Sequence, residues 1–137
     1  MTPKTFSSRA GKILFAALLC TASVAALAQS GTVTERRIRF ARGRTTAVVK
    51  GSIAYAHSDA YTLGARAGQT MSLHIAAANG QVLFNLTAPS GTQVEGAFEE
   101  RDWSGELPES GDYTIAVFRD RFDRSAPSPY TLEVTIR

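Results

Sequence analysis

Residues 71–87 read Met-Ser-Leu-His-Ile-Ala-Ala-Ala-Asn-Gly-Gln-Val-Leu-Phe-Asn-Leu-Thr. On each side of Asn79-Gly80, apolar side chains recur at every second position, and this period places them on one face of a β-strand. The Asn-Gly pair tolerates the positive φ angles of a type I′ turn. The stretch therefore predicts a hairpin that pairs residues 71–76 with residues 81–87.

The same two-residue alternation recurs through most of the chain, and helical periodicity is hard to find after residue 28. Glycine- and proline-containing turn signals separate the apolar runs. Short strands at this spacing are typical of a sandwich or barrel. We predict an all-β fold, a small antiparallel β-sandwich or jelly-roll-like domain of about eight strands, with strands at 33–41, 45–55, 60–66, 70–76, 81–87, 94–98, 112–119 and 129–136.

The first 28 residues have the pattern of a secretory signal peptide. Lys4, Arg9 and Lys12 precede an apolar stretch, and Ala26-Leu27-Ala28 fits a cleavage site. The apolar stretch is short for a membrane span. We expect a signal peptide over 1–28, a single domain over 29–137 with a flexible leader at 29–35, and no membrane span in the exported part. The expected location is the periplasm, with secretion as the alternative.

Charge and cysteine content change once this signal is set aside. The 137 residues carry a formal charge of +3, but residues 29–137 hold 12 basic and 12 acidic residues. A neutral domain lacks the positive surface expected of a nucleic-acid binder, so we expect no nucleic-acid partner. The one cysteine, Cys20, falls within the signal, so the exported domain is expected to be disulfide-free and held together by its core.

Enzyme and metal signatures are weak. The exported part has two histidines, His57 and His74, and no G-x-S-x-G nucleophile motif. An acidic stretch over 95–112 could bind calcium, yet it lacks the alternating oxygen-ligand pattern of a calcium loop and also fits a solvated loop. We therefore expect no catalytic residues, no metal ligands and no cofactor; the acidic side chains are Glu95, Glu99, Glu100, Asp102, Glu106, Glu109 and Asp112.

Two polar segments are candidates for binding a partner. The run Arg119-Asp120-Arg121-Phe122-Asp123-Arg124 follows an apolar strand and is expected to form a hairpin loop before the last strand. Its guanidiniums suit a carboxylate-lined partner, although the two aspartates also fit self-neutralised surface charge. Trp103 lies in polar, loop-like surroundings, where an exposed indole could stack on a sugar ring.

Four segments in order resemble the periplasmic proteinaceous inhibitors of goose-type (g-type) lysozyme. They are Ile38-Arg39-Phe40-Ala41-Arg42-Gly43, Val49-Lys50-Gly51-Ser52-Ile53, Tyr61-Thr62-Leu63-Gly64-Ala65-Arg66-Ala67-Gly68-Gln69-Thr70 and Leu107-Pro108-Glu109-Ser110-Gly111-Asp112-Tyr113-Thr114-Ile115. The pieces Ala-Gly-Gln-Thr and Ser-Gly-Asp-Tyr also occur in β-sandwich domains appended to secreted peptidases. Their order and spacing favour the inhibitors.

The resemblance implies a small β-sandwich whose loop enters the active-site groove of a lysozyme, the expected protein partner. The partner-binding residues that it implies are Tyr61, Ser110, Gly111, Tyr113, Arg119, Arg121 and Arg124. Compared with the family pattern, the arginine loop is shorter and carries two added carboxylates.

Two other functions stay open from the sequence: a carbohydrate- or peptidoglycan-binding module that uses Trp103, and an assembly domain of the cell envelope without catalytic activity.

Overall fold

The computed structural model describes residues 31–78, 81–120 and 124–137. The predicted signal peptide, Asn79-Gly80 and the segment 121–123 lie outside these ranges. No helix long and apolar enough to cross a membrane occurs among the described residues. The eight strands are β1 (Thr32–Arg37), β2 (Thr46–Ile53), β3 (His57–Ala65), β4 (Thr70–Ala77), β5 (Val82–Thr87), β6 (Asp102–Glu106), β7 (Gly111–Arg119) and β8 (Ser128–Ile136).

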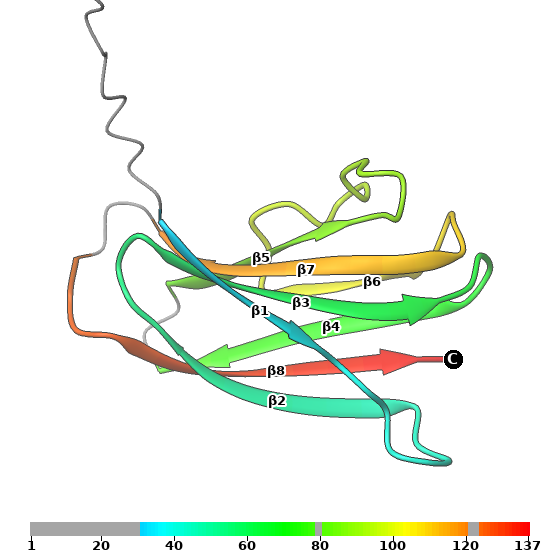
Figure 1. Ribbon diagram of the computed structural model, residues 1–137, viewed down its shortest axis with the longest axis horizontal. Helices are drawn as coiled ribbons and strands as arrows, with labels where there is room; N and C mark the ends of the chain where they lie inside the picture. Colours follow the sequence, from blue (N-terminus) through cyan, green and yellow to red (C-terminus); the bar gives the residue numbers. More distant parts are fainter. Residues whose placement is uncertain (1–30, 79–80, 121–123) are drawn as a thin grey trace, which may run out of the picture.

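The strands form two four-stranded sheets that pack as the layers of a β-sandwich (Figure 1). One sheet has the order β1-β3-β7-β5, and the other has the order β2-β8-β4-β6. All neighbours are antiparallel except β1 and β3, which run parallel from the pair Thr32 and His57 onward. The predicted sandwich class is confirmed.

Strands that follow one another in the chain lie in opposite sheets throughout, from β1 to β8. The predicted hairpin over 71–87 is therefore wrong, because β4 pairs with β6 and β8 whereas β5 pairs with β7. Both strands bury their apolar faces in one core, which stacks them in opposite layers. The arginine loop likewise connects two sheets, because β7 and β8 belong to different layers, so it is not a hairpin.

The core contains the alternating apolar positions found in the sequence. Interior side chains from both sheets have almost no exposed surface, which removes apolar area from water and stabilises the domain. They include Leu63 of β3, Met71, Leu73 and Ile75 of β4, Val82, Phe84 and Leu86 of β5, Tyr113, Ile115 and Val117 of β7, and Tyr130, Leu132 and Val134 of β8.

Two local predictions are corrected. The strand expected at 94–98 is absent, because Gly96 adopts a φ of 73° in a turn, and the sixth strand is Asp102–Glu106 instead. That strand has a single large apolar side chain and so lacks the alternating signal. Part of the expected leader, from Thr32 on, is strand β1, whose six residues are all exposed and are held by pairing with β3.

Candidate functional site

The residues implied by the resemblance are split between the two ends of β7. Ser110 and Gly111 stand at its start, whereas Arg119 is its last residue and Arg124 follows it. At about 3.3 Å per residue, the two ends of this nine-residue strand lie roughly 26 Å apart. Arg121 lies outside the described residues. The expected set therefore does not form one compact surface.

Tyr61 lies in the core and does not face a partner. Its side chain is 1% exposed, and its hydroxyl lies 2.6 Å from the hydroxyl of Tyr130. Tyr130 in turn donates a hydrogen bond to the carboxylate of Asp59, so Tyr61 is the donor to Tyr130. Burial, helped by the hydrogen bond to Asp59, raises the pKa of Tyr130 above its ordinary value. Because Asp59 and Tyr61 belong to β3 and Tyr130 to β8, these groups connect the two sheets.

The Ser110-Gly111-Asp112-Tyr113 segment is a structural corner. The hydroxyl of the buried Tyr113 accepts a hydrogen bond from the backbone amide of Glu109 at 3.0 Å. The same hydroxyl donates a hydrogen bond to the backbone carbonyl of Glu109 at 2.7 Å. The hydroxyl of Ser110 accepts a hydrogen bond from the amide of Ala67 at 2.9 Å. Gly111 has a φ of 140°, and a Cβ there would lie 2.9 Å from Pro89 Cβ. This corner resembles the tyrosine corner of immunoglobulin-like sandwiches.

Arg119 is an internal anchor of the loop between β7 and β8. Its side chain is buried, and its guanidinium donates to the carbonyls of Ser125 and Ala126 at 3.1 and 2.9 Å and to the Ser125 hydroxyl at 2.6 Å. Arg124 points outward instead, with its guanidinium 4.8 Å from the ring centre of Tyr55. A cation over an aromatic face is attracted by the ring quadrupole, which orders the pair. Arg124 and Tyr55 are both exposed.

Trp103 is in strand β6, and its predicted place in a loop is wrong. It stands opposite Leu73 of β4 and packs against the core as a half-buried side chain. Its indole N–H donates to the carbonyl of Glu95 at 3.1 Å, and a Cβ on Gly105 would lie 2.6 Å from the ring. The indole is therefore wedged beneath the 94–97 turn, which leaves less of it for stacking on a sugar.

The outer face of the β4–β6 pair carries polar side chains in register. His74 contacts the carboxylate of Asp102, and the hydroxyls of Ser72 and Ser104 lie 2.8 Å apart. Within the described part of the chain, no group of three or more histidine, cysteine, aspartate or glutamate side chains is arranged to hold a metal ion. The acidic stretch includes Asp102 and Glu106 in β6 and Asp112 in β7.

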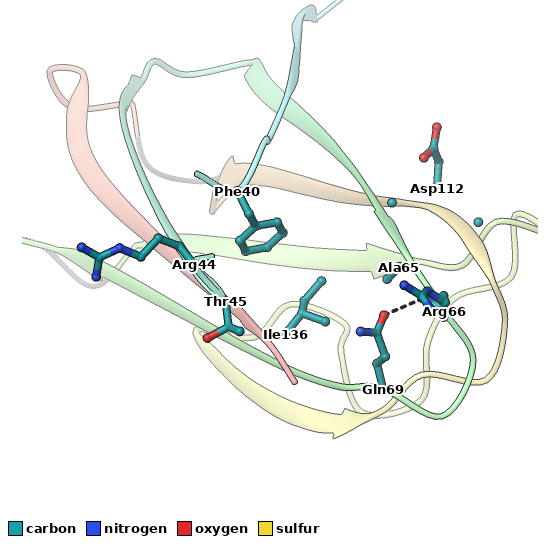
Figure 2. Close-up of a pocket in the computed structure, with 10 residues that line it drawn as sticks. Phe40, Arg44, Thr45, Ala65, Arg66, Gln69, Asp112 and Ile136 are labelled. Atoms are coloured by element: carbon teal, nitrogen blue, oxygen red, sulfur yellow. Dashed lines mark hydrogen bonds between the residues drawn. The ribbon is translucent and has the colours of Figure 1, made fainter. Parts of the chain in front are cut away.

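The start of β7 borders a groove of about 510 Å³ (Figure 2). Phe40, Arg44, Thr45, Ala65, Arg66, Gln69 and Ile136 are among its lining residues. Asp112 also lines the groove and makes a bidentate ion pair with Arg37, with both N–O distances at 2.9 Å. This hydrogen-bonded pair lowers the pKa of Asp112 and raises the pKa of Arg37.

Sequence reasoning missed Tyr55 as the partner of Arg124, the Asp59–Tyr130 bond and the groove. In the sequence, Tyr55 is only one aromatic among several. The groove draws its lining from four separate segments, so no local pattern could have revealed it.

Comparisons with solved structures place this fold among lysozyme inhibitors. The crystal structure of Aeromonas hydrophila PliG, a periplasmic lysozyme inhibitor of g-type lysozyme, is 34% identical to this chain, covers 77% of it and 98% of its own length, and has a TM-score of 0.69. The PliG structures of Salmonella Typhimurium and Escherichia coli, the latter a mutant, are 24% and 23% identical, with TM-scores of 0.59 and 0.58. They cover 76% and 77% of this chain and 98% and 99% of their own.

No protein-family model matches the sequence, and the comparison with curated proteins gave no match. The Aeromonas relative nevertheless shares a third of its residues with this chain over nearly its whole length. The resemblance seen in the sequence is thus confirmed, and this chain belongs to the family of PliG periplasmic inhibitors of g-type lysozyme.

Proposed function

We propose that this chain is an exported, non-enzymatic inhibitor of a g-type lysozyme. The observation that carries this proposal is the 34% identity to Aeromonas hydrophila PliG over 98% of that chain. The signal peptide predicted over residues 1–28 supports export to the periplasm, and the Aeromonas relative is itself a periplasmic inhibitor.

In this proposal, the end of the sandwich that carries Tyr55 and Arg124 contacts the lysozyme. Arginine and tyrosine dominate the residues that contribute most to protein interfaces. The stacking on Tyr55 holds the Arg124 guanidinium at the surface before binding, so little side-chain entropy is lost on association. A guanidinium entering a carboxylate-lined groove forms charge-assisted hydrogen bonds that are strongest where water is excluded. Arg121, three residues earlier, is proposed as a further contact.

The other partner-binding residues that the resemblance implies have structural roles, either beneath this surface or at the opposite end of the sandwich. Arg119 holds the β7–β8 loop through Ser125 and Ala126 and is a positioning residue. Tyr61 supports Tyr130, and Tyr113 supports the 109–111 corner. Ser110 and Gly111 are exposed but belong to that corner, at the far end of β7.

The test is titration of a goose-type lysozyme with the protein spanning residues 29–137, which includes all eight strands, with residual muralytic activity as the readout. We expect stoichiometric inhibition that weakens as salt is raised, because exposed charge contacts are screened. Chicken-type lysozyme is the specificity control. Full activity of the goose-type enzyme at a large excess of this protein would refute the proposed function.

A further inference from the structure

Five arginines gather at the end of the sandwich opposite Arg124, and we call this set the basic end. Arg39, Arg42 and Arg44 lie in the β1–β2 loop, Arg66 lies in the β3–β4 turn and Arg137 follows β8. All five are exposed. None of their guanidiniums has a hydrogen-bond or ion-pair partner among the described residues. Unpaired guanidiniums at a common surface attract anions.

Neighbouring carboxylates only partly offset the charge of the basic end. The β1–β2 connection, residues 38–45, has three arginines and no acidic residue, whereas Asp120 and Asp123 interrupt the other arginine run. Nearby, Asp112 is paired with Arg37, Glu106 stands opposite Thr70 at the end of β6, and Glu109 accepts a hydrogen bond from the amide of Ser90. These carboxylates are fewer than the arginines. Because residues 29–137 are neutral as a whole, the excess positive charge here is a local property of this end.

The groove of Figure 2 opens within the basic end. The ring of Phe40 and the side chain of Ile136 face each other across it, and both belong to or pack against the core. Gln69 is fixed because its Oε1 accepts from the amide of Arg66 at 2.8 Å, and its amide nitrogen is directed into the hollow. Thr45 adds a hydroxyl, and Arg44 extends outward from the rim.

The geometry points to an anionic saccharide as the ligand of this groove. A sugar ring has an apolar C–H face that fits the ring of Phe40, and hydroxyl edges that fit the amide of Gln69 and the hydroxyl of Thr45. A carboxylate or phosphate on that sugar would meet the guanidinium of Arg66, which can bind either group in a bidentate manner, while Arg44, extending outward from the opposite side of the groove, adds positive charge that attracts the anion. The volume of about 510 Å³ lies within the range of small-ligand pockets.

A sugar fits this groove better than a lipid surface does. Membrane-surface binding needs apolar side chains that protrude from the surface, whereas Phe40 is half-buried and Ile136 is 8% exposed inside a concavity. A neutral sugar would leave the arginines unused. The site is independent of the proposed lysozyme contact, because β7 separates the two by its full length.

The test is isothermal titration calorimetry of the protein spanning residues 29–137 with three probes. They are a carboxylated disaccharide of N-acetylglucosamine and N-acetylmuramic acid, a phosphorylated disaccharide of N-acetylglucosamine, and the neutral, fully N-acetylated chitotetraose. We expect at least one anionic probe to bind about tenfold or more tightly than chitotetraose, and the double variant Arg44→Ala/Arg66→Ala to lose about tenfold in affinity for it. The two anionic probes decide between carboxylate and phosphate.

The matched control is Arg124→Ala, which removes an exposed arginine at the other end and should leave saccharide binding unchanged. Both tested arginines are exposed, so the double variant retains the core. The double variant should also inhibit goose-type lysozyme like the unmodified protein, which separates this proposal from the proposed function. Failure of both anionic probes to bind at concentrations up to about 10 mM would overturn the inference, as would equal affinity for chitotetraose or unchanged affinity in the double variant.

Discussion

The hydroxyl of Tyr130 donates a hydrogen bond to the carboxylate of Asp59 across the interface between the two sheets. Asp59 is 7% exposed, so its carboxylate has little access to water and depends on this donor. Substituting Tyr130→Phe removes the donor and leaves a buried carboxylate underpaired. We expect the free energy of unfolding to fall by about 2 kcal/mol.

Tyr61→Phe is the matched control for that prediction. It removes a hydroxyl from the same cluster but leaves the bond from Tyr130 to Asp59 in place. Its cost should be about 1 kcal/mol or less, measured by urea denaturation of both variants. Equal losses in the two variants would show that Asp59 does not depend on Tyr130.

Stability at high pH should report the same cluster. The pKa of Tyr130 is raised in the folded protein, so folding favours the protonated phenol. A group with a raised folded pKa contributes stability that is present below the unfolded pKa and lost as the pH rises above it. Denaturation midpoints measured from pH 8 to 11 should therefore fall more steeply above about pH 10 for the unmodified protein than for Tyr130→Phe. Parallel profiles would contradict this assignment.

Arg124 and Arg119 should affect lysozyme inhibition in different ways. Arg124→Ala should weaken inhibition about tenfold while the unfolding midpoint stays unchanged, because the side chain is exposed. Arg119→Met should weaken inhibition and also lower the unfolding midpoint, because it removes three hydrogen bonds that hold the β7–β8 loop. The inhibition constant and the thermal midpoint of each variant check this. An unchanged inhibition constant in Arg124→Ala would remove Arg124 from the contact.

Gly111 should resist substitution more than another glycine with positive φ. Gly111→Ala requires a φ of 140° and places a Cβ 2.9 Å from Pro89, so we expect a loss of about 2 kcal/mol or more. Gly43 has a φ of 72°, and a Cβ there would have no atom within 4 Å, so Gly43→Ala should cost about 1 kcal/mol. Chemical denaturation of both variants gives the comparison, and the reverse order would argue against the close contact with Pro89.

The ion pair between Arg37 and Asp112 should give a weaker, pH-dependent effect. The pKa of Asp112 is lowered by Arg37, so the carboxylate contributes stability above its ordinary pKa, and this contribution is lost as the pH falls through the folded value. A double-mutant cycle with Arg37→Ala and Asp112→Asn should show coupling at pH 7 that shrinks in acid and in 1 M salt. A coupling energy that is the same in acid as at pH 7 would show that the ion pair is not its source.

The sequence predicted which side chains are buried better than which strands are neighbours. Alternation at positions such as Met71, Leu73 and Ile75 identified the interior face, because a strand has a period of two residues whatever it pairs with. The same alternation does not tell an edge-to-edge hairpin from two strands stacked across a core. The Asn79-Gly80 signal therefore led to the wrong pairing of β4 with β5.

The candidate site was harder to predict, because burial decides the role of each side chain. Arg119 and Arg124 stand five residues apart in one polar run, yet one is an internal anchor and the other faces outward. Trp103 has polar neighbours in sequence, but its pairing opposite Leu73 turns it inward. Neither outcome is encoded in local composition.

The alternation of consecutive strands between the two sheets has a kinetic consequence. No two successive strands among the eight pair, so each sheet needs contacts between residues far apart in sequence, and such folds form slowly. The last two strands, β7 and β8, occupy central places between β3 and β5 and between β2 and β4. Neither sheet can be completed until β7 and β8 are available, so the order of strands along the chain delays closure of both layers of the sandwich to the end of folding.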